Sequence, residues 1–294
     1  MSAVDLAGTI DHEAVDWNGI VGARYRIDQS LRYVYETPIH NLHHRLIIAP
    51  RKQHGDQQRI DHRIWSSTHV PLTESIDAYG NDVVSLSISR VAREITFGLT
   101  STIVRAADVR VPTAAADEVS DPCWMDGGRL TRPDALLLDA AADLRARHLD
   151  PYECAHEVMR FVHRHMTYTK NVTDVFTTAA TAFHMGRGVC QDFSHIAIAL
   201  ARACGFGARY ASGHLLGEGA THAWVEFLIP STTGSRVLSL DPTYGSPTDF
   251  RYLVVAIGRD YDDVPPTSGY FSGSSSGTLF GQQHVRLTQL TYAA

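Results

Sequence analysis

The sequence predicts an α+β protein, in which an N-terminal antiparallel β-sandwich domain is followed by a domain where helices precede a mostly antiparallel sheet. Three changes along the chain predict it. Short β-rich runs come first, helical periodicity takes over after a Pro- and Gly-containing stretch, and strand-like runs then return. We therefore expect an N-terminal extension over 1–21, the β-sandwich over 22–111, a linker over 112–132 and the helix-containing domain over 133–294.

The sandwich is predicted by short runs rich in β-branched and aromatic residues, which polar or Gly-containing turns separate. These runs are 24–35, 44–49, 62–70, 83–90 and 95–104. Val84, Leu86 and Ile88 alternate with serines, which is typical of a strand with one buried and one solvated face. Strands of this kind pack face to face as an antiparallel sandwich.

Four helices are predicted between residues 133 and 204. Pro133 and Pro151 suit a first helical turn, and Asp150 can cap the second helix. A third, short helix is expected over 178–185, and a fourth over 190–204. The fourth is the most regular, with one apolar face made by Phe193, Ile196, Ala197, Leu200 and Ala203.

Strand-like runs follow the helices. They are 208–215, 222–229, 236–240, 252–258 and 284–292. Because the helices come first and the strands after them, we expect a mostly antiparallel sheet in this second half.

The composition excludes several classes of protein. Of 294 residues, 44% are hydrophobic and 20% charged, which is typical of a soluble globular protein with a substantial core. The net charge of −6 argues against a nucleic-acid partner, and no stretch approaches the roughly 20 apolar residues of a membrane span. The N-terminal residues carry acids where a secretory signal carries bases, so we expect a cytoplasmic location and no membrane partner.

Neither the cysteines nor the histidines indicate a metal site. The four cysteines form no C-x-x-C pair and are too sparse for a disulfide framework. Sixteen histidines include a cluster at His40, His43 and His44, but no Cys or acidic partner stands at a recognised ligand spacing. We therefore expect no metal and no cofactor.

Cys190 lies where a thiol can be activated. Gly186 and Gly188 in the run GRGVCQDFSH allow a tight turn, after which Cys190 begins the fourth helix. Free backbone N–H groups and the positive end of the helix dipole favour a thiolate at that position. The same N–H groups could bind the oxyanion of a tetrahedral intermediate. Such a thiol needs a base.

A base and its orienting carboxylate are predicted on two neighbouring strands. His222 stands at the start of the run 222–229, and Asp241 directly follows the run 236–240. Adjacent antiparallel strands would bring the two together, so that His222 takes the proton of Cys190 and Asp241 fixes the imidazole tautomer. Taken singly, each residue has an ordinary explanation: Cys190 could pack in the core, His222 could lie on the surface, and Asp241 could start a turn. Their joint occurrence at three element ends favours catalysis.

The blocks GRGVCQDFSH, THAWVEF and DPT resemble those of the transglutaminase-like superfamily, in particular its bacterial branch of candidate cysteine proteases. The resemblance extends over residues 22–292, and the first half is similar to the β-sandwich that precedes the catalytic domain in this branch. It implies a papain-like, transglutaminase-like α+β catalytic domain over 133–294. Cys190, His222 and Asp241 fall on the positions of the family's nucleophile, histidine and aspartate. The polar loop IPSTTGSR and Tyr244 depart from the family pattern and could alter the substrate cleft.

Four further residues are candidates for binding substrate or the oxyanion. Gln191 belongs to the family block and is explained equally well as a first-turn residue. Trp224 could wall the cleft near His222, although packing in the sheet explains it as well. The four candidates are Gln191, Tyr168, Thr173 and Trp224.

Three other residues of the fourth helix are not predicted to react. Asp192 is expected to be an ordinary first-turn acid. His195 lies five residues after Cys190, which on a helix points its side chain away. Cys204 lies too far along the helix to pair with Cys190, so we expect it to pack.

The three residues and the resemblance together predict acyl transfer at an amide bond through a thioester acyl-enzyme. If water resolves it, a peptide or protein amide is hydrolysed, which we expect of a bacterial member. If an amine acceptor resolves it, the protein is a transglutaminase or an amide ligase in peptide tailoring. These residues do not separate the two, because the cleft selects the acceptor. A non-catalytic binding protein of the same fold is the alternative from another class, and the intact Cys, His and Asp argue against it.

Overall fold

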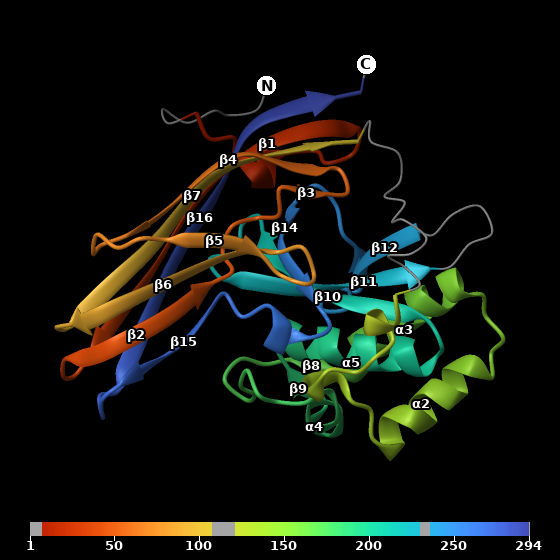
Figure 1. Cartoon of the computed structure of the whole chain (residues 1–294). Coiled ribbons are helices and arrows are strands. Elements are labelled where there is room, and N and C mark those ends of the chain that lie inside the picture. Colours follow the sequence, from red (N-terminus) through yellow and green to blue (C-terminus); the bar gives the residue numbers. More distant parts are fainter. Residues whose placement is uncertain (1–7, 108–120, 230–235, 294) are drawn as a thin grey trace.

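The protein has an α+β fold, as the sequence predicts, with a two-sheet β-sandwich beside a helical region that has its own sheet (Figure 1). The computed structural model describes residues 8–107, 121–229 and 236–293. In Figure 1 the helices cover one side of the sheet that contains β10 and β11, and the sandwich lies on its other side. Among the described residues, no helix has the length and apolar character that a membrane crossing requires.

The sandwich consists of a five-stranded sheet, in the order β16-β1-β7-β4-β3, and a four-stranded sheet, in the order β15-β2-β6-β5. All the pairings are antiparallel. The predicted runs 24–35, 83–90 and 95–104 lie within β1, β6 and β7, whereas 44–49 and 62–70 overlap β2 and β4 only in part, because both of these strands begin and end earlier. Alternate residues of β1, such as Tyr25 and Ile27, face the core and are fully buried. The strands are β1 (Ile20–Tyr35), β2 (Ile39–Leu46), β3 (Gln53–His54), β4 (Gln57–Ser66), β5 (Thr73–Ile76), β6 (Asp82–Val91), β7 (Glu94–Ala106), β15 (Thr267–Ser272) and β16 (Gly277–Tyr292).

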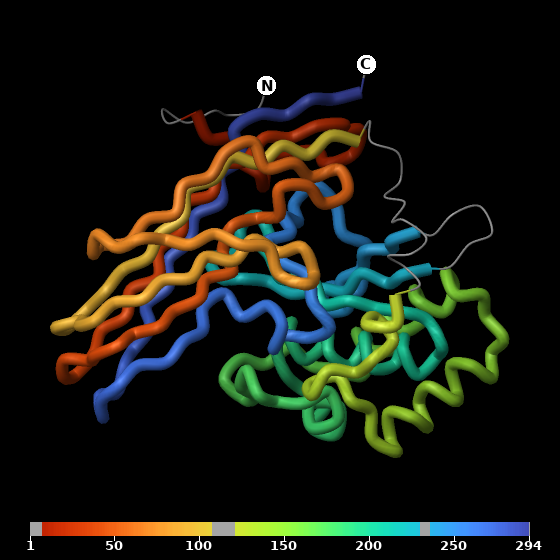
Figure 2. Tube along the Cα trace, in the orientation of Figure 1, coloured from red at the N-terminus to blue at the C-terminus, as the bar shows by residue number. Residues whose placement is uncertain are grey.

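The predicted limit of the second domain, 133–294, is wrong at its C-terminal end. β15 pairs with β2, and β16 pairs with β1 along almost its whole length, from Ile20↔Tyr292 to Tyr35↔Gly277. Figure 2 shows the dark blue end of the chain running beside the red N-terminal strand. An alternating pattern identifies a strand but does not say which sheet edge it joins. Here the open edges of β1 and β2 take up the last two strands, so the helical region is inserted between β7 and β15.

Parts of the predicted extension and linker belong to the packed structure. Within the predicted extension, 1–21, Ile10 donates its backbone N–H to Leu287 at 2.7 Å, and Val15 is buried. A short 3₁₀ helix, η1 (His12–Ala14), lies between them. The predicted linker, 112–132, is described from residue 121 and contains η2 (Pro122–Trp124) and η3 (Arg129–Thr131). The departing loop, IPSTTGSR, lies mostly outside the described residues.

The helical region contains the four predicted helices. Each begins with a residue that accepts a hydrogen bond from the first turn: Asp134 before α2, Asp150 before α3 and Thr178 before α4 use their side chains. Asp150 and Glu153 form a capping box, in which each side chain accepts from the backbone of the other. The helices are α2 (Ala135–Arg145), α3 (Pro151–His165), α4 (Ala179–Met185) and α5 (Cys190–Ala203).

Helix α5 is the centre of this region. It packs on β10 and β11 with one face, and α2, α3 and α4 cover the other, so every residue from Gln191 to Arg202 is buried. The sequence predicts only one apolar face. The small residues between, such as Ala199 and Ala201, let the neighbouring helices approach the second face.

The sheet beneath α5 has the strand order β13-β12-β11-β10-β14 and is antiparallel throughout. β14 is one edge strand of this sheet. Amide side chains from the sandwich form hydrogen bonds with its exposed backbone groups. Gln57 exchanges two hydrogen bonds with the backbone of Val254, at 2.7 and 2.9 Å, and Asn81 does the same with Ile257, at 2.8 and 2.9 Å. Two amides therefore replace a neighbouring strand. The strands are β10 (Gly207–Leu215), β11 (Thr221–Ile229), β12 (Arg236–Asp241), β13 (Ser246–Pro247) and β14 (Tyr252–Gly258).

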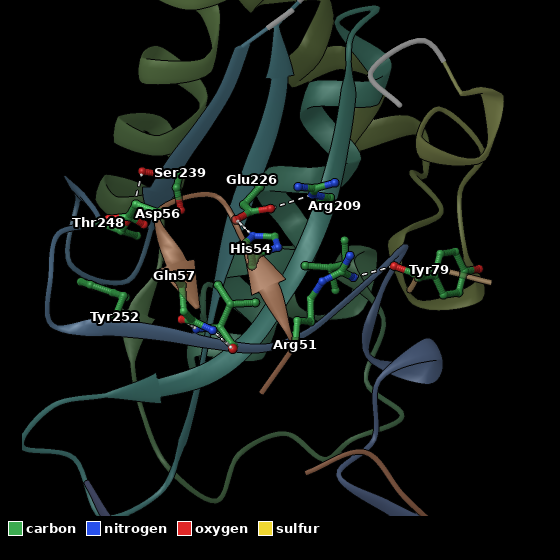
Figure 3. Close-up of polar contacts among 12 residues, drawn as sticks. Arg51, His54, Asp56, Gln57, Tyr79, Arg209, Glu226, Ser239, Thr248 and Tyr252 are labelled. Carbon is green, nitrogen blue, oxygen red and sulfur yellow. Dashed lines mark hydrogen bonds and ion pairs between the residues drawn. The ribbon is translucent and has the colours of Figure 1, made fainter. Parts of the chain in front are cut away.

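A buried charged cluster joins the same two regions (Figure 3). Glu226 of β11 points away from α5 and accepts a hydrogen bond from Arg209 of β10 at 2.6 Å. His54 of β3 reaches across from the sandwich and lies 2.7 Å from the second carboxylate oxygen of Glu226. Burial disfavours the carboxylate, but the charges of His54 and Arg209 outweigh it and lower the pKa of Glu226. We call these three residues the interface cluster.

Candidate active site

Cys190 is the first residue of α5, and the local sequence explains why the helix starts there. Gly186 ends α4 with a φ of +62°, a conformation that glycine adopts without strain. The short strands β8 (Thr167–Tyr168) and β9 (Arg187–Gly188) then pair in parallel. A Cβ on Gly188 would lie 2.3 Å from the Asp192 carboxylate, so only glycine fits. The backbone is therefore fixed up to the residue before Cys190. The Cys190 side chain itself is half-buried.

Asp192 fixes the start of α5, as expected of a first-turn acid. Its Oδ2 accepts a hydrogen bond from the backbone N–H of Val189 at 2.7 Å and another from the hydroxyl of Thr173 at 2.7 Å. Burial raises the pKa of Asp192, and these two hydrogen bonds oppose that effect. Thr173, a candidate for substrate binding, thus uses its hydroxyl to hold the helix start.

His222 and Asp241 lie on adjacent antiparallel strands, as predicted. β11 and β12 pair with Val225 opposite Leu240, which brings the start of one strand to the end of the other. His222 Nε2 lies 2.7 Å from Asp241 Oδ2, and both side chains are buried. The second oxygen, Asp241 Oδ1, accepts the backbone N–H of Thr243 at 2.7 Å. The carboxylate is therefore fixed in position.

The imidazole of His222 also reaches the thiol of Cys190. Burial disfavours the imidazolium, but hydrogen bonds to Asp241 and Cys190 and the charges of these two groups outweigh it. Together they raise the pKa of His222 to about 10. The structure thus brings Cys190, His222 and Asp241 into one contiguous group, and the imidazole is protonated at neutral pH.

A buried aromatic shelf supports the histidine. Trp224 stacks on His222 with ring centroids 6.3 Å apart and meets Tyr252 edge-on at 5.3 Å. Only 1% of Trp224 is exposed, which agrees with packing in the sheet, the interpretation that the sequence favours, and not with a wall of the cleft. The twofold period of β11 places it on the same face as His222, where it packs beneath the imidazole.

Tyr252 is a functional candidate that the sequence does not reveal. Its hydroxyl donates a hydrogen bond to Asp241 Oδ2 at 2.9 Å, the oxygen that also faces His222. In the sequence Tyr252 only begins a β-rich run, where an aromatic residue is ordinary packing. The one available signal, a tyrosine at a strand end, is too common to single it out.

Two turns flank the solvent side of His222. Glu218, in the turn between β10 and β11, has Oε2 3.4 Å from His222 Nδ1. Tyr244, in the turn between β12 and β13, donates its hydroxyl to Glu218 Oε1 at 2.6 Å and lies with its ring 5.7 Å from the imidazole. Tyr168 of β8 is 48% exposed, and burial and the charges of Cys190 and Glu218 raise the pKa of its hydroxyl. Gln191, by contrast, turns its amide to the backbone of Val175 at 3.3 Å.

The other histidines of this region serve the fold. His195 is fully buried, and its Nε2 accepts the backbone N–H of Tyr261 at 3.2 Å. Burial lowers the pKa of His195 to about 3, so it is neutral. Within the described ranges, no three His, Cys, Asp or Glu side chains gather as metal ligands would.

Comparisons with known proteins agree with this architecture. Residues 139–242 match the family model of the transglutaminase-like superfamily, and residues 25–104 match that of the bacterial transglutaminase-like N-terminal region. An uncharacterised protein of Mycobacterium tuberculosis is 29% identical over 289 residues, which cover 87% of this chain and 90% of that protein. An uncharacterised protein of Mycobacterium leprae is 28% identical over 276 residues, with 87% and 96% covered.

A solved structure has the same fold. A candidate cysteine protease from Cytophaga hutchinsonii superimposes with a TM-score of 0.75 and 18% identity, covering 92% of this chain and 93% of its own. At this identity the likeness concerns the fold, and it includes both the sandwich and the helical region.

Proposed function

Because the chain combines a transglutaminase-like core with the bacterial N-terminal region, and so belongs to the transglutaminase-like superfamily, we propose that it is a cysteine-dependent enzyme that hydrolyses peptide or protein amide bonds. The observation that carries the proposal is the position of His222, between the Asp241 carboxylate at 2.7 Å and the thiol of Cys190. A histidine held in this way can keep a proton at rest and pass it on during the reaction.

The resting centre is an ion pair of thiolate and imidazolium. The raised pKa of His222 supports this state, since a protonated imidazole beside the sulfur stabilises its negative charge. The start of α5 adds the positive end of the helix dipole and its free backbone N–H groups. The Asp241 carboxylate, 2.7 Å from Nε2, fixes the orientation of the imidazolium.

In the first step, the Cys190 sulfur attacks the amide carbonyl carbon, and the backbone N–H groups of the first turn of α5 donate hydrogen bonds to the oxyanion. The C–N bond breaks, the leaving nitrogen takes the proton of His222, and a thioester remains on Cys190. In the second step, a water molecule gives a proton to His222 while its oxygen attacks the thioester. The C–S bond breaks, the carboxylic acid leaves, and the thiolate–imidazolium pair is restored.

Transfer to an amine is the second candidate function. It uses the same first step, after which an amine instead of water gives its proton to His222 and takes the acyl group. The carboxylate of Glu218 at the mouth of the site favours this candidate, because a protonated amine is attracted to it. The expected cytoplasmic location stays a prediction.

Trapping the acyl-enzyme tests the proposal. The protein is incubated with a library of peptides and amides, and an adduct is sought on Cys190 by mass spectrometry. Cys190→Ser must abolish the thioester, and His222→Ala must slow amide turnover by at least about a thousandfold. Cys123→Ser is the matched control, since Cys123 is also a half-buried free cysteine and lies on η2. Wild-type turnover in Cys190→Ser or His222→Ala rejects the assignment.

A further inference from the structure

One group of side chains near Cys190 has no role in the steps above. Glu218 and Tyr244 come from two different turns, yet they are joined by a hydrogen bond of 2.6 Å across the solvent side of His222. The Glu218 side chain is 32% exposed, and Tyr244 is 52% exposed.

The Glu218 carboxylate has two polar contacts here, and neither partner is a permanent cation. One is the Tyr244 hydroxyl, and the other is His222 Nδ1 at 3.4 Å. Under the proposed function, the imidazolium of His222 already balances the Cys190 thiolate and is held by Asp241. Around the imidazole of His222, three groups that can be negative therefore face one positive group, and Glu218 is the exposed one of them.

One tyrosine, Tyr244, is hydrogen-bonded to this carboxylate, and a second, Tyr168, is close enough for the charge of Glu218 to act on its hydroxyl. Tyr168 and Tyr244 are both about half-exposed. Burial is the main cause that raises the pKa of the Tyr168 hydroxyl, and the charges of Cys190 and Glu218 add to it. The faces of tyrosine rings attract ammonium and guanidinium groups, and a carboxylate next to them strengthens the attraction. Aromatic faces combined with one carboxylate suit a cation better than a neutral or anionic group.

There is also room beside Glu218. The carboxylate lines a surface pocket of about 500 Å³ between the turn 217–219 and the sandwich strands β1 and β16. A group held in this pocket could contact Glu218, because the other two charged lining residues, Arg286 and Asp28, pair with each other.

We propose that Glu218, Tyr244 and Tyr168 form a recognition site for a cationic group, an ammonium or a guanidinium, placed beside the reacting thiol. The proposal rests on the proposed function and names its substrate class. The cation belongs either to a lysine or arginine of the amide substrate or to the amine that accepts the acyl group. Glu218 provides the charge, Tyr244 holds Glu218 in place, and the rings provide the contact faces.

Charged thiol reagents test the site without any turnover. Methanethiosulfonates with an ethyltrimethylammonium or an ethylsulfonate group modify Cys190 at rates that depend on the local charge. In the wild type we expect the cationic reagent to be favoured, and in Glu218→Gln the ratio of the two rates falls roughly tenfold. The difference should shrink as salt is raised, because the site is partly exposed.

Two variants serve as controls. Glu94→Gln makes the same change in net charge on the sandwich, where Glu94 pairs with Arg32, and must keep the wild-type ratio. Cys190→Ser supplies the background of the other thiols. Tyr244→Phe keeps the ring but loses the hydroxyl that orients Glu218, so an intermediate ratio is expected. An unchanged ratio in Glu218→Gln overturns the proposal.

A second pair of measurements identifies where the cation comes from. Peptide amides that differ only by lysine or norleucine next to the scissile bond are compared for the rate at which Cys190 is acylated. In parallel, the fraction of acyl-enzyme captured by a primary diamine is compared with the fraction that is hydrolysed. A lysine preference that Glu218→Gln removes assigns the cation to the substrate, and a loss of diamine capture assigns it to the acceptor.

These outcomes separate the two proposals. If no amide acylates Cys190 but the reagent ratio depends on Glu218, the proposed hydrolysis fails and the cation site remains. If amides are turned over and neither the reagents nor the peptides respond to Glu218, the reaction stands and the cation site is rejected.

Discussion

Strand β11 contributes one residue to each of two histidine–carboxylate pairs. The nitrogen–oxygen distance is the same in both pairs, but the neighbouring groups differ. His222, at the start of β11, lies 2.7 Å from Asp241, and Glu226, four residues further, lies 2.7 Å from His54. Both pairs are mostly buried and lie on one face of the strand. The first has a thiol at a helix start beside it. The second is enclosed between the sandwich and the sheet, together with Arg209.

The difference shows that the role of a histidine–carboxylate pair depends on the group next to it, which is a thiol in one case and a guanidinium in the other. Next to Cys190, the imidazolium can give its proton to a leaving group and take another from water. Next to Arg209, the charges of the pair are fixed by a permanent cation, and no reacting group is near. The same hydrogen bond can therefore serve a reaction at one end of a strand and join two regions at the other.

The largest expected effect comes from breaking each pair by removing its histidine. His222→Ala should lower kcat/KM by a thousandfold or more, about 4 kcal/mol of transition-state stabilisation. His54→Ala should stay within a few-fold of wild type per folded molecule, because His54 contacts no reacting group. Amide turnover normalised to folded protein measures both, and similar losses in the two variants would contradict the comparison.

The next largest effect is on stability, and it is expected at the interface cluster and not at the His222 pair. Glu226→Gln leaves the guanidinium of Arg209 buried without its counter-charge, which should lower the free energy of unfolding by about 3 kcal/mol. Glu157→Gln is the matched control, since Glu157 pairs with exposed arginines on α3 and should lose less than about 1 kcal/mol. Urea denaturation measures both. Equal losses would mean that the interface cluster is no stronger than a surface pair.

A smaller effect on activity is expected from Tyr252, which tests whether a third residue helps to orient the His222 pair. Tyr252→Phe removes a hydrogen bond to the ionised Asp241, so the carboxylate orients the imidazole less firmly. We expect kcat to fall about tenfold with little change in KM, whereas a purely structural role would lower stability and leave kcat per folded molecule unchanged. Tyr33→Phe, which removes a tyrosine hydroxyl in the sandwich, is the control.

The two pairs should also fail at opposite ends of the pH scale. The pKa of His222 is raised from 6.5 to about 10, so its pairing stabilises the fold fully below pH 6.5 and loses that effect as pH rises toward 10. The pKa of Glu226 is lowered from 4.5, so its pairing is present above pH 4.5 and is lost on acidification. We expect kcat/KM to fall on the alkaline side near pH 10, where His222 loses the proton that the leaving group needs. An alkaline fall near pH 6.5 would contradict this.

The sequence predicts local elements well because their causes are local. The caps at Asp150 and Thr178, and the glycines before Cys190, determine where helices begin within a few residues. Cys190, His222 and Asp241 could be proposed from the sequence because they occur together at element ends and in blocks that resemble those of a known family.

What the sequence does not predict are the contacts between distant segments. Tyr252 meets Asp241, Gln57 covers Val254, and Glu226 meets His54 only after the sandwich and the sheet have packed together. None of these contacts has a spacing or a pattern in the chain, since each depends on tertiary packing.

The pairing of β16 with β1 has a consequence for how the molecule is made. The edge strand of the larger sheet is completed only by residues 277–292, long after the helical region has been synthesised. On the ribosome, α2 to α5 are already present while β1 and β2 still have open edges. The region that carries Cys190 therefore emerges before the sandwich that supports β14 and Tyr252 is closed, so a nascent chain is expected to gain reactivity only after residues 277–292 have been synthesised.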